Sequence, residues 1–358
     1  MKNNYDDIRP YGPGEVKPAV ESLLRDRQFM TILRGFIPLP KSVIRFIIRT
    51  MFIGVNTPLD FQLRYMKHVV RYVLRKCSDG CTFGGHPLPS KEQHHTYLSN
   101  HRDIVLDSAI LDLKLVEEGY DNTVEIAIGD NLLISPWIRT LVKINKAFTV
   151  KRGLSPRQLL ESSMLMSNYI HHAVKEKGEN IWIAQREGRA KDSDDRTQES
   201  VLKMLGYGGN IRELNIVPLT ISYEFDPCDY LKAREMQLKR DNPKWKKSRK
   251  DDLVSMSVGI KGQKGRIVYR LTPSINHDID AALAERPELR ELSRNEQIQF
   301  VCELIDRHIH AAYEIYPRGT EFDEYIESRL QLIHLSNKDT HFLRDRLYEM
   351  CNYPVLNY

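Results

Sequence analysis

Short apolar runs alternate with segments of helical periodicity between residues 81 and 223, and this alternation restricts the fold more than any other feature of the chain. Strands separated by helices are typical of a parallel sheet with helices on both faces. We therefore predict an α/β fold, with a mostly parallel mixed sheet flanked by helices. The expected strands are 82–85, 95–98, 124–128, 147–150, 180–184 and 215–223.

Helical patterns lie on both sides of this region. A polar arm (1–14) precedes expected helices at 16–33, 41–55 and 58–76, and further helices are expected from 293 to 313, from 322 and from 340. Residues 254–260 and 266–271 are expected to form a hairpin that closes the sheet. Pro218 should mark an edge or the start of a strand. We divide the chain into N-terminal helices (1–78), an α/β domain (79–275) and a helical C-terminal extension (276–358) packed on the same domain.

The segment 41–55 combines a basic stripe with an apolar surface. Lys41, Arg45 and Arg49 recur at every fourth position, and most of the other residues are apolar. The segment is too short and too charged to span a bilayer, which needs about 20 mostly apolar residues. Two interpretations remain, a helix docked on its own domain and a helix in the plane of the lipid headgroups, with arginines towards phosphates.

Composition sets mild limits on partners and compartment. The formal charge of +5 favours an anionic partner or surface without identifying one. The basic run 239–250 holds a single Trp, which is no nucleic-acid motif, so no nucleic acid is expected. The five cysteines are scattered, and no secretion signal opens the chain. We therefore expect reduced thiols in the cytoplasm, with the protein peripheral on the inner face of the membrane.

The stretch 99–107 places a histidine between a strand and a helix. His101 follows the strand at 95–98, and Asp103 and Asp107 come within the next six residues. Asp103 is a good N-cap, and Asp107 lies one turn later on the same face. An imidazole held by a carboxylate can take a proton from an alcohol at neutral pH. The alternative is an ordinary capping aspartate beside a corner histidine.

Basic residues follow other expected strands. Arg152 follows 147–150, and Arg186 and Arg189 follow 180–184. Ligands of open parallel sheets collect at the carboxyl ends of the strands. Together with His101, these arginines predict an anion-binding cleft that contains a base.

Four blocks of the sequence resemble those of the glycerolipid acyltransferases, the phospholipid/glycerol acyltransferase family. They are Asn100-His101 with Asp107, Phe148 to Arg152, Glu187-Gly188-Arg189, and Ile216-Val217-Pro218. Their order and spacing agree with the family across about residues 80–225. This chain has five residues between His and Asp where the family usually has four, and it lacks the family's residue between Gly188 and Arg189.

The resemblance implies acyl transfer from a thioester, on acyl carrier protein or coenzyme A, to a hydroxyl of a glycerol-3-phosphate or lysophosphatidate-type acceptor. No other cofactor and no metal are implied. His101 would be the base, paired with Asp107 if the extra residue is a bulge at the helix start, or else with Asp103. Arg152 and Arg189 would bind phosphate, and Glu187 would bind another hydroxyl or fix an arginine. The substrate-binding residues implied in all are Asn100, Arg102, Phe148, Lys151, Arg152, Arg186, Glu187, Gly188, Arg189 and Pro218.

Other functions remain open on the sequence. An acyltransferase for an amino acid or for another lysolipid would share the same blocks, and a non-catalytic membrane lipid-binding protein could retain them in degenerate form. In a hydrolase, His94, His95, His101 and Asp103 could be metal ligands. His94 and His95 are adjacent in a strand, however, and so face opposite ways.

Overall fold

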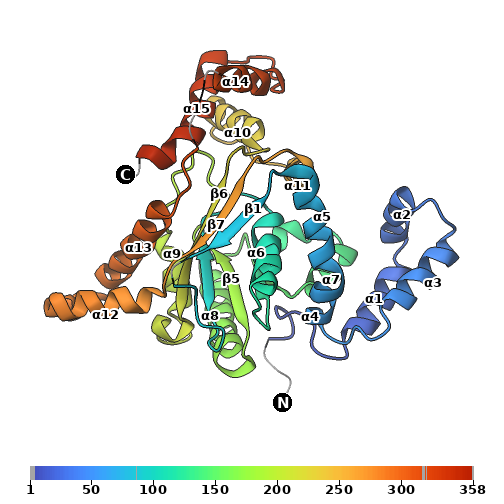
Figure 1. The fold of residues 1–358 in the computed structure, drawn as a ribbon, viewed down its shortest axis with the longest axis horizontal. Helices are drawn as coiled ribbons and strands as arrows, with labels where there is room; N and C mark the ends of the chain where they lie inside the picture. The colour runs from blue at the N-terminus through green and yellow to red at the C-terminus, as the bar shows by residue number, and fades with distance from the viewer. Residues whose placement is uncertain (1–4, 86, 317–318, 320, 357–358) are drawn as a thin grey trace.

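A seven-stranded sheet lies at the centre of the computed structural model, which describes residues 5–85, 87–316, 319 and 321–356 (Figure 1). Its strand order is β1-β7-β6-β2-β5-β3-β4, and every neighbouring pair is parallel except β6 with β7. The expectation of a mostly parallel mixed sheet is therefore confirmed. The strands are β1 (Cys81–Gly84), β2 (Thr96–Ser99), β3 (Val124–Gly129), β4 (Ala147–Val150), β5 (Asn180–Ala184), β6 (Ile216–Tyr223) and β7 (Ile267–Leu271).

Helices cover both faces of the sheet because successive strand residues point to opposite sides. In β2, Tyr97 packs in one apolar core and Leu98 in the other, and both are fully buried. The Tyr97 face is covered by α5 (Lys67–Cys77) and α6 (Leu106–Glu117). The Leu98 face is covered by α8 (Pro156–His172), α9 (Glu199–Leu205), α12 (Ile275–Glu285) and α13 (Arg294–Ala311).

The N-terminal helices form a third apolar cluster at one side of the sheet (Figure 1). They are α1 (Val16–Arg25), α2 (Arg27–Phe36), α3 (Lys41–Met51) and α4 (Pro58–Phe61), and they pack on α7 (Pro136–Ile144). The expected helix 16–33 is two helices, because Asp26 ends α1 and caps α2 by accepting from the Phe29 N–H at 2.8 Å. No helix within the described residues is long and apolar enough to cross a membrane.

A fourth cluster lies at the C-terminal end of the chain. Here α14 (Glu321–Gln331) and α15 (Thr340–Leu356) pack on α10 (Asp229–Asp241), which follows β6 (Figure 1). The helix predicted from the Ser293–Glu296 capping box is present as α13, with both capping hydrogen bonds.

Two sequence predictions are wrong. Residues 254–260 belong to a helix, α11 (Arg249–Lys261), so they form no hairpin with β7. Their apolar/polar alternation resembles a strand, but a capping box at Ser248 and Asp251 starts a helix. Pro218 is the third residue of β6, an interior strand. It pairs with Leu98 of β2, but alternate N–H groups of β6, such as that of Ile221, face the β2 side, so the missing N–H of Pro218 would face β7. It is tolerated because the β6·β7 ladder begins only at Leu219.

Candidate active site

His101 and Asp107 form a hydrogen-bonded pair at the carboxyl end of β2. The His101 Nδ1 lies 2.8 Å from Asp107 Oδ2, and the His101 side chain is 14% exposed. Asp107 is the second residue of α6 and is 1% exposed. Its carboxylate also accepts the backbone N–H groups of Arg102, at 2.7 Å, and Asp103, at 3.0 Å. These three bonds fix the carboxylate against the loop that carries the histidine.

The pairing determines which ring nitrogen is free. An ionised carboxylate only accepts hydrogen bonds, so the proton of a neutral His101 ring belongs on Nδ1. The lone pair is then on Nε2, the nitrogen that can accept a proton from a substrate. The His101 ring and the Trp182 ring of β5 lie edge to face, with the ring centroids 5.8 Å apart. The arrangement is that of a general base held by a carboxylate.

Asp103 serves as a cap and lies against α11. Its Oδ1 accepts the N–H groups of Val105 and Leu106, each at 2.8 Å, as predicted, but it caps the turn before α6, because the N-cap residue of α6 is Val105 and not Asp103. Helix α6 starts at Leu106, so Ile104 and Val105 form a turn that takes up the extra residue before Asp107. A Cβ added to Gly259 of α11 would lie 1.9 Å from Asp103 Oδ2, so α11 approaches the carboxylate closely. Burial and the neighbouring Asp107 raise the pKa of Asp103.

The polar residues predicted to follow the strands do meet at one edge of the sheet. Because β2, β5, β3 and β4 are parallel neighbours, their carboxyl ends lie on the same side. Arg152, after β4, has its Nη1 2.6 Å from Glu187 Oε1, after β5. The Arg152 N–H donates to Asp130 Oδ1, after β3, at 3.0 Å. Glu187 therefore fixes an arginine, one of the two roles the sequence left open.

Arg186 and Arg189 are partly buried and differ in their surroundings. Arg186 Nη1 donates to the Asp194 carbonyl at 3.0 Å. Arg189 lies near Cys228, Asp226 and Asp103, and its Nη1 is buried without a hydrogen-bond partner. Burial lowers the pKa of Arg189, but these neighbours outweigh burial and raise it. Arg189 is thus a charged donor with unused hydrogen-bonding capacity beside Asp103.

The other residues implied by the resemblance have mostly interior positions. Asn100 and Arg102 are buried, and their side chains bond to protein atoms, Asp195 and Tyr313 among them. Phe148 and Pro218 are buried in the sheet. Lys151 is exposed, and Gly188 is exposed with φ +73°, a backbone conformation that favours glycine between Glu187 and Arg189. The interior positions favour supporting roles over substrate contact.

Comparison with known proteins gives a weak likeness to a solved structure. No family model matches the chain, and no curated protein matches it. Among solved structures, the chain is similar to the crystal structure of the 1-acyl-sn-glycerophosphate (LPA) acyltransferase, PlsC, from Thermotoga maritima. The TM-score is 0.42 and the sequence identity 10%, over 83% of this chain and 97% of that chain. A likeness this weak carries no argument about fold or activity.

The histidines proposed as metal ligands do not converge. The His95 ring binds the Ser90 carbonyl at 2.9 Å and the Asn215 side-chain amide at 2.7 Å, at the start of β2. His101 lies beyond the other end of that strand. Within the described part of the chain, no three His, Cys, Asp or Glu side chains are grouped so that they could hold a metal ion.

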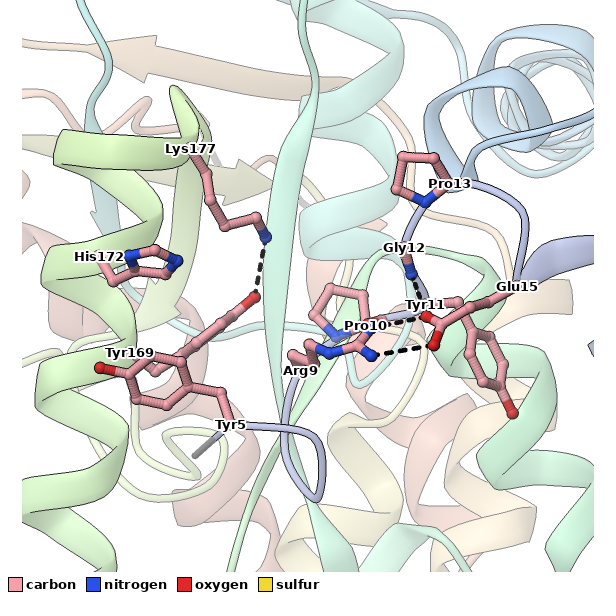
Figure 2. Close-up of a pocket in the computed structure, with 10 residues that line it drawn as sticks. All are labelled: Tyr5, Arg9, Pro10, Tyr11, Gly12, Pro13, Glu15, Tyr169, His172 and Lys177. Atoms are coloured by element: carbon pink, nitrogen blue, oxygen red, sulfur yellow. Dashed lines mark hydrogen bonds and ion pairs between the residues drawn. The ribbon is translucent and has the colours of Figure 1, made fainter. Parts of the chain in front are cut away.

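The structure also contains a cavity of about 430 Å³ (Figure 2). Its walls include Tyr5, Arg9, Tyr169 and Lys177, and Lys177 precedes β5. His101 follows β2, which is parallel to β5, so the cavity belongs to the opposite edge of the sheet. Its cations already have partners, since Arg9 pairs with Glu15 and Lys177 donates to Tyr169 (Figure 2). The His101–Asp107 pair is therefore a stronger candidate for the active site than this cavity.

Sequence reasoning missed the residues that support the histidine from a distance. Tyr269 of β7 donates its hydroxyl to the Asp107 carbonyl at 3.1 Å. Asp195 and Tyr313 bind the two neighbours of His101. These residues lie 94 or more positions along the chain from His101, and no local pattern distinguishes them from other aspartates and tyrosines.

Proposed function

We propose that this protein is an acyltransferase that moves a fatty acyl group from acyl carrier protein or coenzyme A to a hydroxyl group. The acceptor is of the glycerol-3-phosphate or lysophosphatidate type, and the pathway is phospholipid synthesis. The observation that carries the proposal is the His101–Asp107 pair at the sheet edge where Arg152 and Arg189 also lie. The resemblance of the four sequence blocks supports the acyl chemistry. The thioester is a co-substrate, and the proposal requires no further cofactor.

The chemistry follows from the free Nε2 of His101. Nε2 takes the proton of the acceptor hydroxyl while the hydroxyl oxygen attacks the thioester carbonyl carbon. The C–S bond then breaks, the ester forms, and the departing sulfur receives the proton from the imidazolium. Asp107 stabilises the imidazolium and keeps the ring oriented, as the aspartate does in a Ser-His-Asp triad. The substrate oxygen takes the place of the serine.

The arginines give the site its preference for an anion. A guanidinium fork matches two phosphate oxygens and stays charged at neutral pH. Arg189 is the stronger candidate because its Nη1 lacks a partner. Arg152 is paired with Glu187, whose side chain is 69% exposed, so a phosphate competes for Arg152 only with an exposed ion pair.

The proposed location is peripheral, on an anionic inner membrane surface. Exposed apolar side chains cluster on α3 and just after it, including Phe46 at 71% and Ile53 at 72% exposure. The arginines of the predicted stripe face α1 instead, because Arg49 pairs with Glu21 at 2.7 Å and Arg45 Nε donates to the Leu24 carbonyl at 3.0 Å. Apolar contact would therefore contribute more to membrane binding than these arginines.

An acyl-transfer assay with a panel of acceptors tests the function. The purified protein receives radiolabelled acyl thioester on either carrier, with glycerol 3-phosphate, lysophosphatidate, a lysolipid or an amino acid as acceptor. We expect a labelled ester from a phosphate-bearing acceptor and none from the His101→Ala variant. Labelled amide from an amino acid would identify the alternative acceptor class. No labelled product with any acceptor would refute the enzymatic function.

A further inference from the structure

The loop that carries His101 is anchored on both sides of the histidine. Asn100 is fully buried, and its side-chain amide pairs with the Ile221 backbone of β6, accepting its N–H at 2.8 Å and donating to its carbonyl at 3.0 Å. Arg102 is 8% exposed, with Nη1 2.8 Å from Ser193 Oγ and Nη2 2.7 Å from Asp195 Oδ2. The backbone of His101 is thus held between two residues whose side chains point into the protein.

One hydroxyl joins the two anchors. The Tyr313 hydroxyl accepts from Asn100 Nδ2 at 3.0 Å and from Arg102 Nη2 at 2.7 Å, and it donates to Asp195 Oδ2. The Arg102 guanidinium also lies 5.5 Å from the centre of the Tyr313 ring. Tyr313 and Asp195 are 4% and 0% exposed, so water does not compete for these bonds. Removing this hydroxyl alone would release a contact on each side of His101.

The network extends to the C-terminal helices. Tyr313 follows α13, and the Ser193 hydroxyl that accepts from Arg102 donates to the Met350 carbonyl of α15 at 2.8 Å. The position of the histidine loop is therefore coupled to segments more than 200 residues away along the chain.

We propose that Tyr313 and Asp195 are positioning residues for His101. They fix Asn100 and Arg102, so that the imidazole keeps its hydrogen bond to Asp107 and directs Nε2 to the acceptor. The effect on turnover rests on the proposed function, whereas the effect on the ring does not. Misplacing a catalytic group by about 1 Å can cost about 100-fold in rate.

The test observes the imidazole directly in the full-length protein. With ¹⁵N-labelled histidine, the His101 ring signals are assigned by their absence from His101→Asn. We expect the Nδ1–H proton bonded to Asp107 to give a resonance protected from exchange with water. Tyr313→Phe, which removes only a hydroxyl, should broaden or abolish this resonance. It should also lower kcat by about 10- to 100-fold, with little change in KM for the acceptor.

A matched control is Tyr120→Phe, because Tyr120 is also buried and donates one hydroxyl hydrogen bond, to the Pro89 carbonyl at 2.6 Å. This variant should keep the resonance and the wild-type kcat. Asp195→Asn is a second variant for the same test. If Asp195→Asn does not fold, Tyr313→Phe alone decides whether the positioning proposal holds. Folded Tyr313→Phe protein with an unchanged resonance would overturn the proposal. If the resonance is lost as expected but the wild-type protein transfers no acyl group, the positioning inference holds and the proposed function fails.

Discussion

At the scale of single residues, the two aspartates near His101 make different hydrogen bonds. Asp107 holds the His101 ring and two backbone N–H groups, whereas Asp103 caps the turn before α6. We expect Asp107→Asn and His101→Ala each to lower kcat by about 10²- to 10⁴-fold. His101→Ala removes the base, and Asp107→Asn leaves the His101 ring without the carboxylate that orients it. Asp103→Asn should be mild, since Asn caps about as well as Asp. Turnover of the two Asn variants, measured on folded protein, decides whether Asp107 or Asp103 is the functional partner of His101. An inactive Asp103→Asn beside an active Asp107→Asn would reverse the assignment.

Phosphate recognition is also a property of single residues. We expect Arg189→Ala to weaken binding of a phosphate-bearing acceptor by about 1.5–3 kcal/mol, the range for a hydrogen bond to a charged group. Arg152→Ala should have a smaller effect, because Glu187 already engages Arg152. KM values for acceptor and donor give the comparison. A suitable control is Arg157→Ala, whose side chain is 90% exposed. An equal loss with a phosphate-free acceptor would contradict the assignment to phosphate.

The sequence was informative about this site wherever chemistry is local. The capping role of Asp103 follows from its position before a helix, and the bond from His101 to Asp107 spans only six residues. It was not informative about Tyr313 and Asp195, which reach His101 only through the packing of α13 and a distant loop. It also left the environment of the arginines open, because the partners Glu187 and Asp226 depend on how loops fold at the sheet edge.

At the scale of elements, α3 presents an apolar surface away from its own cluster. Ile44 is fully buried among the N-terminal helices, whereas Phe46 and Ile53 are mostly exposed. We expect Phe46→Glu with Ile53→Glu to reduce binding to anionic liposomes, because burial of an apolar side chain contributes about 1.5–3 kcal/mol. Liposome co-sedimentation of the full chain is the measurement. Deleting α1–α3 is a poorer test, since it would uncover the apolar side of α7.

The control for this double variant is Leu332→Glu, which changes an exposed leucine after α14. It should sediment with liposomes like the wild-type protein. If the α3 double variant also sediments unchanged, then α3 is not the membrane-binding surface.

Elements were predictable where several local signals agreed. The strands of the parallel region and α13 combine apolar runs, caps and turn residues, and they lie close to the expected ranges. The prediction of a strand at 254–260 was wrong because two local signals conflicted. Their alternation favours a strand, but Ser248 and Asp251 start a helix whose Gly259 packs on Asp103. A contact of that kind is tertiary, and periodicity cannot reveal it.

At the scale of the whole molecule, alternating strands and helices predict the sheet but not its strand order. The connection from β6 to β7 reverses direction through α10 and α11, which places α11 beside the histidine loop. The C-terminal helices return to the same loop through Ser193 and Tyr313. The candidate site is therefore assembled from β2 and from segments much later in the chain, which explains why the four sequence blocks account for only part of it.

Buried carboxyl groups predict how the stability of the whole fold depends on pH. Asp112 of α6 accepts the Val124 N–H of β3 and the Gln62 side-chain amide, each at 2.9 Å. Burial raises its pKa to about 7, and burial also raises the pKa of Glu125. An unfolded aspartate loses its proton near pH 4, so between about pH 4 and 7 Asp112 binds more protons in the folded state than in the unfolded state. The contribution of Asp112 to the free energy of unfolding should therefore fall as pH rises through this range, against the opposite contribution of His95, whose pKa burial lowers.

Urea denaturation at a series of pH values measures this slope. Asp112→Asn removes the titrating group, so its free energy of unfolding should fall less between pH 4 and 7, whatever its absolute value. Asp121→Asn is the control, because Asp121 is exposed, and it should keep the wild-type slope. Glu15, whose hydrogen bond from Arg9 lowers its pKa to about 2, adds stability as pH rises through the unfolded-state pKa of 4.5. This contribution is the same in the wild-type protein and in both variants, so it does not affect the comparison of their slopes. Equal slopes for Asp112→Asn and the wild-type protein would show that Asp112 does not retain its proton in the fold.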